Sequence, residues 1–220
     1  MKKYPMSTIA AFEKEIRMQP KFLEKFVPQK PLSMKKQKRT IFCGTGDSFL
    51  SAKIGEIFSG FRAKAFDPLN LLKNKRLLKD HDLCLISISG NTISNVKLAK
   101  ATKNTTAITA NPQGRLARVC QKSIILKYSH SEIFTAGSIS FLSSAMTCLS
   151  LVSKYHTRNV SKIYNQARTQ SKKVNLKGKI YLLGNLHTMP IAMFCAAKLY
   201  EVLGLDAHYA WVEQFSHMEL

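Results

Sequence analysis

The feature that most constrains this chain is an apolar, strand-like run that ends in glycine and is followed by a helical stretch. It occurs at residues 40–46 (TIFCGTG), 83–91 (LCLISISGN) and 180–185 (IYLLGN). A strand that turns at glycine into a helix is typical of α/β folds, in which successive strands are parallel and are joined by right-handed crossovers. The chain is therefore predicted to be α/β, with parallel sheets.

The remaining elements extend this pattern into a doubly wound sheet. A helix over residues 7–26 precedes it, and Pro20 is expected to end or kink that helix. We predict an N-terminal helical segment at 1–36 and a doubly wound domain with a parallel sheet at 37–156. Further strands are expected at 63–66, 105–109 and 123–126, and helices at 92–102, 112–119 and 136–155.

Residues 157–220 are predicted to begin a second α/β unit. A basic helix and linker run to about residue 179, and a strand at 180–185, a helix at 189–203 and a strand at 207–210 follow. Two strands and one helix do not make a two-faced sheet. We therefore expect either that the chain is a fragment or that another subunit completes this half.

The charge of the chain favours anionic partners. Lys and Arg number 34 against 13 Asp and Glu, a formal net charge of +21. Between Asp82 and Glu201 the only acidic residue is Glu132, against sixteen Lys or Arg. Such a surface attracts phosphates or nucleic acid, although lysines that only keep the surface soluble give the same composition.

The cysteines and the apolar stretches exclude other classes. The five cysteines are far apart, with no metal-ligand spacing, so we expect buried thiols in a reducing cytoplasm, no metal and no cofactor. Residues 136–152 are too short for a membrane span, and no export signal is found in the first twenty residues. We therefore expect a cytoplasmic protein that does not enter the membrane.

Two loops are the candidate ligand sites, because open α/β sheets bind ligands at the carboxyl ends of their strands. Loop 1, residues 44–48, is glycine-rich and opens a helix, which suits an anion. Loop 2, residues 87–92, combines three hydroxyls, a glycine and a helix start. Simple turn chemistry is the alternative for both loops. A dinucleotide fingerprint is disfavoured because Phe49 stands in place of its third glycine, although Asp67 is placed to mimic the ribose-binding acid.

These loops resemble those of the sugar isomerase (SIS) domain family, and the resemblance spans nearly the whole chain. Residues 43–45 (CGT) are similar to the first loop of glucosamine-fructose-6-phosphate aminotransferase, and residues 87–92 (SISGNT) to the S-x-S-G-N-T loop of archaeal-type phosphoglucose/phosphomannose isomerases. The resemblance implies a flavodoxin-like sheet and a sugar phosphate bound by loop 2. The implied phosphate ligands are Ser87, Ser89, Gly90, Asn91 and Thr92; the implied sugar contacts in loop 1 are Gly44, Thr45, Gly46 and Ser48.

The resemblance also implies a catalytic pair. Residues 198–201 (KLYE) resemble the stretch whose glutamate moves a proton between C1 and C2 of the sugar, and His217 falls at the spacing of the ring-opening histidine. Glu201 and His217 are thus the expected catalytic residues, with Glu213 ranked behind Glu201. Lys198 is either a substrate contact or an i, i+3 partner of Glu201.

A third loop completes the expected site. Glu132, followed by residues 135–138 (TAGS), is similar to a family loop that lines the sugar, so Glu132 and Thr135 are expected substrate contacts; capping a helix is the alternative for Glu132. Family sites take the histidine from a neighbouring subunit, which implies a homodimer with a shared site. No nucleophilic cysteine begins the chain, so use of glutamine is not expected.

The function that the sequence predicts is aldose–ketose isomerisation of a hexose or hexosamine 6-phosphate. The alternative is a SIS module that binds a sugar phosphate without catalysis. Nucleic-acid binding through residues 158–179 is the third hypothesis, and we do not expect it because the segment lacks interleaved aromatic residues.

Overall fold

A computed structural model describes residues 7–133 and 135–218 of the chain. These residues form two compact units. The first, here called the central-sheet unit, comprises Pro28–Lys127 and Ser140–Lys154. The second, here called the three-segment unit, is built from the N-terminal helix, Tyr128–Ile139 and the chain from Tyr155 onward.

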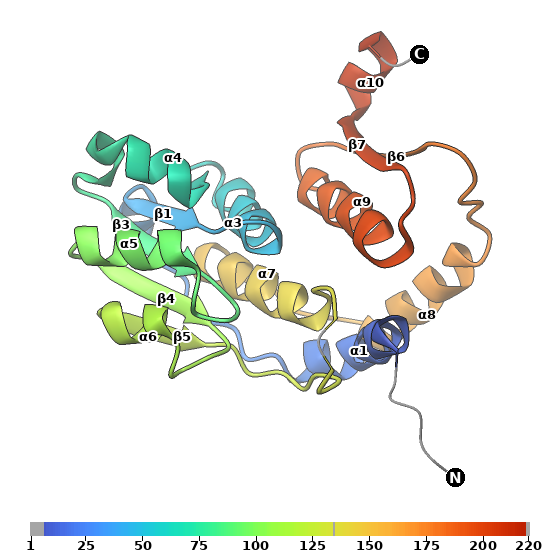
Figure 1. The fold of residues 1–220 in the computed structure, drawn as a ribbon, viewed down its shortest axis with the longest axis horizontal. Helices are drawn as coiled ribbons and strands as arrows, with labels where there is room; N and C mark the ends of the chain where they lie inside the picture. Colours follow the sequence, from blue (N-terminus) through green and yellow to red (C-terminus); the bar gives the residue numbers. More distant parts are fainter. Residues whose placement is uncertain (1–6, 134, 219–220) are drawn as a thin grey trace. The chain divides into compact units, whose positions relative to one another are not determined.

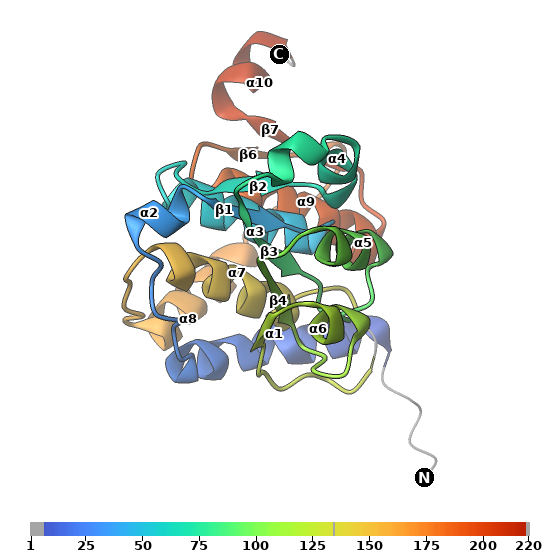
Figure 2. The same cartoon turned by 90° about the vertical axis from the view of Figure 1, so that its left-hand side faces the viewer.

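The central-sheet unit contains a five-stranded sheet in the order β2-β1-β3-β4-β5, of which the first four strands are labelled in Figure 2. Every neighbouring pair is parallel, which confirms the predicted doubly wound α/β class. The chain passes from the edge pair β1–β2 to β3 on the other side of β1, so the winding reverses between β1 and β3. The strands are β1 (Thr40–Cys43), β2 (Lys64–Phe66), β3 (Asp82–Ile86), β4 (Thr105–Thr109) and β5 (Lys122–Ile125).

Helices cover both faces of this sheet (Figure 1). On one face, alternate residues such as Ile41, Leu83 and Leu85 pack with Leu71 and Leu98 in one buried apolar cluster. On the other face lie α3 and α7, joined by a hydrogen bond between the hydroxyls of their serines. The helices of the unit are α2 (Met34–Gln37), α3 (Asp47–Phe58), α4 (Pro68–Lys73), η1 (Lys75–Leu78), α5 (Ile93–Ala101), α6 (Arg115–Val119) and α7 (Ile139–Val152).

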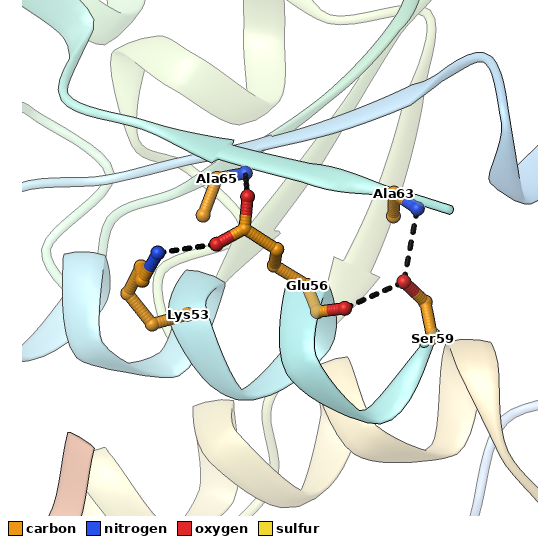
Figure 3. Close-up of polar contacts among 5 residues, drawn as sticks. All are labelled: Lys53, Glu56, Ser59, Ala63 and Ala65. Atoms are coloured by element: carbon orange, nitrogen blue, oxygen red, sulfur yellow. Dashed lines mark hydrogen bonds and ion pairs between the residues drawn. The ribbon is translucent and has the colours of Figure 1, made fainter. Parts of the chain in front are cut away.

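Strand β2 is an edge strand, and one of its amides and that of the preceding residue bond to side chains at the C-terminal end of α3 (Figure 3). The Ala65 N–H donates to Oε1 of Glu56 (3.2 Å), and the Ala63 N–H donates to Oγ of Ser59 (2.9 Å). The Glu56 carboxylate, which is buried, also forms an ion pair with Lys53. Because free edge amides are templates for pairing with other chains, these contacts both fix α3 on the strand and close the edge.

The three-segment unit combines helices with a two-stranded parallel sheet, β6-β7. Its N-terminal helix contacts the helix at residues 160–171, and Oγ of Ser161 donates to Oε1 of Glu24 (2.8 Å). The aromatic ring of Tyr181 on β6 packs against His208 on β7 and Phe215 on the last helix. The elements are α1 (Thr8–Lys25), α8 (Val160–Ser171), β6 (Ile180–Gly184), α9 (Met189–Leu203), β7 (Ala207–Trp211) and α10 (Val212–Met218).

Buried Glu15 joins two distant segments of this unit. Its carboxylate accepts hydrogen bonds from the amide and hydroxyl of Ser131 (3.2 and 3.0 Å) and from the hydroxyl of Ser138 (2.9 Å). Three donors compensate for the loss of water around a buried carboxylate. The contact therefore ties the Tyr128–Ile139 segment to α1.

The helices differ from expectation in places. We expected Pro20 to end or kink the first helix; α1 runs through Pro20 to Lys25, so the proline does not end it. Packing on both sides of the proline supports the helix, with Glu15 buried before it and Glu24 bonded to α8 after it. Helix α6 begins only at Arg115, because the residues before it form a turn against loop 2.

Candidate functional site

Loops 1 and 2 lie at the carboxyl ends of neighbouring strands, β1 and β3. The strand order reverses at this pair. In open parallel sheets, ligands bind in the crevice outside such a reversal point, because the two flanking loops diverge to opposite faces. The fold thus brings together, from sequence positions more than forty residues apart, the two loops that the sequence singles out.

Loop 1 is tightly packed at its first glycine. A Cβ atom on Gly44 would lie 2.7 Å from the backbone carbonyl carbon of Ser48, so only glycine lets strand β1 enter α3 at this distance. Gly46 has a φ of 58°, which favours glycine on conformational grounds. Loop 1 is therefore built for a close approach of strand and helix.

Asp67 gives loop 1 a negative neighbour. The hydroxyl of Thr45 donates to Oδ2 of Asp67 (3.3 Å), while Oδ1 of Asp67 accepts from the Leu69 amide (2.8 Å) at the start of α4. Asp67 is thus a helix cap that also bonds to loop 1. These two contacts explain its position, and a ribose-binding role is not needed to do so. Because a carboxylate repels a phosphate, the better anion site of the two is loop 2.

Loop 2 brings two of its hydroxyls together at the start of α5. Oγ of Ser87 and Oγ1 of Thr92 are 2.8 Å apart, and Ser87 is buried. Thr92 is the N-cap residue of α5, yet its side chain makes no capping bond to that helix. The first amides of α5 therefore keep their N–H groups for another acceptor, and hydroxyls beside a helix N-terminus suit a phosphate.

The exposed part of loop 2 contains Ser89 and Asn91. The Asn91 amide donates to Oγ of Ser89 (3.3 Å), and Nδ2 of Asn91 donates to the Ser89 carbonyl (3.1 Å). Gly90 has a φ of 67°, a conformation that favours glycine. The loop thus holds its own shape while the Ser89 hydroxyl faces outward.

A turn that sequence reasoning missed lies against loop 2. Residues 109–114, between β4 and α6, donate to it at several points: Oγ1 of Thr109 bonds to the Ile88 carbonyl (3.1 Å), and Nδ2 of Asn111 bonds to the Ser89 carbonyl (3.2 Å). The signal available in the sequence is the run N-P-Q-G at 111–114, which is typical of a turn at a strand end. We interpreted most of that run as helix.

The third expected loop belongs to the three-segment unit. Glu132 is exposed with a φ of 67°, and its amide donates to Nδ1 of His130 (3.0 Å). The hydroxyl of Thr135 donates to the Thr8 carbonyl of α1 (3.0 Å). In this structure, therefore, the Thr135 hydroxyl serves to fasten the loop to α1, and the Glu132 side chain lies at the surface.

Lys198 and Glu201 form a pair on α9. Nζ of Lys198 is 2.7 Å from Oε2 of Glu201 and 5.1 Å from the centre of the Phe194 ring. Lys198 is only 7% exposed, whereas the Glu201 side chain is 49% exposed. The nearly buried ammonium of Lys198 thus fixes the orientation of the half-exposed Glu201 carboxylate. This is the i, i+3 pairing that we gave as the alternative to a substrate contact for Lys198.

His217 and Glu213 form a second pair on α10. Nε2 of His217 is 3.3 Å from Oε1 of Glu213, and both side chains are exposed. The expected catalytic residues Glu201 and His217 therefore both lie in the three-segment unit, each with an ionisable partner on its own helix. Loops 1 and 2 lie in the central-sheet unit.

The part of the chain that the structure describes gives no support for a metal site or for a membrane-spanning helix. Among residues 7–133 and 135–218, no cluster of three His, Cys, Asp or Glu side chains is arranged to hold a metal ion. Within the same residues, every helix is too short or too polar to span a bilayer. All five cysteines are free, and burial raises the pKa of the Cys84 thiol to about 12.

The five-stranded parallel sheet, with loops 1 and 2 at its reversal point, is a doubly wound α/β fold. Solved structures with this fold include the C-terminal domain of glucosamine-fructose-6-phosphate aminotransferase from Francisella tularensis, which is 15% identical with a TM-score of 0.70. The match covers 99% of this chain and 73% of that one. No family model matches the sequence, and no curated protein matches it.

Two further structures support the same fold. Tagatose-6-phosphate ketose/aldose isomerase from Escherichia coli is 21% identical with a TM-score of 0.71, over 97% of this chain and 69% of that one. Glucosamine-6-phosphate deaminase from Thermotoga maritima is 20% identical with a TM-score of 0.70, over 96% and 72%. The resemblance to SIS domains that the loops suggested is thereby confirmed at the level of the fold.

Proposed function

We propose that this chain binds a phosphorylated sugar at loop 2 and isomerises it between aldose and ketose. The observation that carries the proposal is the hydroxyl pair of Ser87 and Thr92 at the N-terminus of α5, beside the reversal point of the sheet. Support comes from solved structures of the same fold whose names specify sugar 6-phosphates. The positive charge of the chain favours the same class of ligand.

In the proposed reaction, loop 2 binds the phosphate and Glu201 transfers the proton. The hydroxyls of Ser87, Ser89 and Thr92 and the first amides of α5 hold the dianion. The Glu201 carboxylate takes the C2 proton of the open-chain aldose, which leaves an enediolate with its negative charge on O1. A proton then passes from the O2 hydroxyl to O1, and Glu201 returns its proton to C1 to give the ketose. The excess of positive charge stabilises the enediolate oxygen.

His217 and a second subunit complete the proposal. The histidine protonates the ring oxygen as the hemiacetal hydroxyl loses its proton, so that the ring opens before the C2 proton is taken. We further propose a homodimer that shares the site, in a reducing cytoplasm that suits five free thiols.

A second candidate function is binding of a sugar phosphate without catalysis. It is favoured by the state of the expected catalytic groups. Glu201 is already ion-paired with Lys198, and the His217 side chain is 72% exposed. A general base must reach the proton that it removes. Catalysis therefore requires that the Glu201 carboxylate contact the sugar while it stays paired with Lys198.

One experiment distinguishes the two functions. The purified protein is incubated in D₂O with fructose 6-phosphate, glucose 6-phosphate or glucosamine 6-phosphate, and the C1 and C2 protons are followed by NMR. Isomerisation predicts loss of these signals, and Glu201→Gln abolishes it while Glu213→Gln, the matched change on α10, does not. Exchange that survives in Glu201→Gln would show that another residue is the base. If no sugar exchanges its protons, the isomerase function is refuted.

Binding is tested separately by calorimetry with the same sugars. Ser87→Ala and Thr92→Val each remove one hydroxyl that bonds to a charged ligand, which weakens affinity by roughly 10- to 150-fold. Ser123→Ala on strand β5 is the control, because it removes an exposed hydroxyl at the far edge of the sheet. Equal affinity in all three variants would place the phosphate outside loop 2.

A further inference from the structure

The backbone of loop 2 is held from one side by the turn at residues 109–114 and by Leu116 at the start of α6. The Ile88 carbonyl accepts from Oγ1 of Thr109 and from the Ala110 amide, both at 3.1 Å. The Ser89 carbonyl accepts from Nδ2 of Asn111 (3.2 Å), and the Gly90 carbonyl accepts from the Leu116 amide (2.8 Å). Three successive carbonyls of loop 2 are therefore turned toward β4.

This orientation determines where an amide of loop 2 points. In a trans peptide unit the C=O of one residue and the N–H of the next point in opposite directions. The amides of Gly90 and Asn91 bond within the loop, to the Ser87 carbonyl and to Oγ of Ser89. The Ser89 amide is thus directed away from β4, toward the β1 side of β3, where the reversal point of the sheet lies.

Two glycines allow the turn to approach this closely. A Cβ atom on Gly114 would lie 2.9 Å from the Cα of Gly90, and one on Gly90 would lie 3.2 Å from the Cα of Gly114. Gly114 has a φ of −63° and a ψ of 154°, which any residue adopts. Glycine is therefore required at position 114 by the space that Gly90 occupies, and not by its own backbone conformation.

We propose that Asn111 and Gly114 are positioning residues for the phosphate loop, which hold the Ser89–Gly90 peptide unit from the side of β4 and so fix the course of the backbone that carries Ser89 to the ligand. The inference rests on the proposed function, because it concerns how loop 2 receives the phosphate. Neither residue needs to touch the ligand. Asn111 fixes the Ser89 carbonyl, and Gly114 sets the distance of the turn from Gly90.

The test uses the full chain and three variants on this turn. Asn111→Ala removes one of the two bonds to the Ser89 carbonyl and leaves the one from Nδ2 of Asn91. Gly114→Ala forces the turn away from Gly90 without straining position 114. Gln113→Ala is the control, because Gln113 is exposed on the same turn and only its backbone amide bonds to Asn111. Calorimetry measures affinity for fructose 6-phosphate, and ¹H–¹⁵N spectra record the amide shifts of loops 1 and 2.

The expected result is a loss of affinity that accompanies a change in loop 2 alone. Asn111→Ala weakens binding by about 3- to 10-fold, the effect of one lost hydrogen bond. It shifts the amide signals of Ser89 and Gly90 and leaves those of loop 1 in place. Gly114→Ala gives the same pattern with a larger loss, and Gln113→Ala gives neither effect.

The outcomes separate this inference from the proposed function. Unchanged Ser89 and Gly90 signals in Asn111→Ala and Gly114→Ala overturn the positioning role, whatever the wild type binds. Shifted signals with unchanged affinity also overturn it, because loop 2 would then move without consequence for the ligand. If the wild-type protein binds no sugar phosphate, the proposed function fails, and with it the ligand that this inference assumes.

Discussion

The contact that closes the edge of the central sheet makes a quantitative prediction about stability. Glu56→Ala removes the acceptor of the Ala65 amide and the partner of Lys53 (Figure 3). An amide left without an acceptor costs about 1 to 3 kcal/mol when it is out of contact with water, and the Ala65 amide is part-buried. The ion pair adds at most about 1 kcal/mol, because Lys53 is a third exposed. We therefore expect the free energy of unfolding to fall by about 1 to 4 kcal/mol.

A matched substitution separates the two terms. Glu56→Gln keeps an oxygen for the Ala65 amide and loses only the charge, so its cost is expected to stay below about 1 kcal/mol. Urea unfolding followed by far-UV circular dichroism measures both variants, and an unchanged m-value shows that stability alone has changed. Equal losses in Glu56→Ala and Glu56→Gln would refute the reasoning, because the charge and not the edge amide would then carry the effect.

The single tryptophan provides an internal control for this measurement. Trp211 lies on β7 in the three-segment unit, whereas Glu56 lies in the central-sheet unit. If the units unfold independently, Glu56→Ala shifts the circular dichroism transition and leaves the tryptophan transition in place. Glu56→Ala is also expected to scatter more light on refolding than Glu56→Gln, because it frees an edge amide for pairing.

Three further predictions concern packing, pH and the Glu15 contact. Gly44→Ala is expected to cost about 1 to 3 kcal/mol in urea unfolding, because its Cβ would lie 2.7 Å from the α3 backbone. Burial raises the pKa of Cys84 to about 12, so the folded protein keeps a proton that the unfolded chain releases above pH 9. Stability is then full below pH 9 and falls up to pH 12, by about 1.4 kcal/mol per pH unit for each such thiol, as urea unfolding at pH 7, 9 and 10.5 would show; a flat profile would contradict this. Glu15→Gln is expected to speed hydrogen exchange of the Ser131 amide, its donor, whereas the exposed Glu13→Gln leaves that rate unchanged; equal rates in both would contradict the contact.

The elements of the fold were largely predictable because they depend on local patterns. Strands β1 and β4 begin and end where the sequence predicts, since each is a short run of β-branched and apolar residues bounded by polar or turn residues. Strand β3 ends at Ile86, two residues before the predicted end at Ile88. Ser87 still bonds to Ile108 in β4, and Ile88 bonds to Ala110 just after it, but the strand pairing itself ends at Ile86. The point at which the pairing ends is not visible in the run itself.

The candidate site was predictable only at the level of its loops. That loops 1 and 2 lie side by side follows from parallel strand order, which the alternation of strands and helices indicates. The contacts of Thr45 with Asp67 and of Ser89 with Asn111 join residues 22 positions apart in the sequence. Such contacts depend on strand register and on how each turn bends, and neither is fixed by the composition of one segment.

The division of the chain into segments has a consequence for how the protein folds. Nearly all of the central-sheet unit is formed by one stretch, Pro28–Lys127, whereas the three-segment unit depends on contacts such as that of Glu15 with Ser131, which are 116 positions apart. Contacts between distant positions form late, because a long loop must close before they contribute. During synthesis, α1 therefore leaves the ribosome before the segments that it contacts, and the sheet between them is able to fold earlier than the three-segment unit.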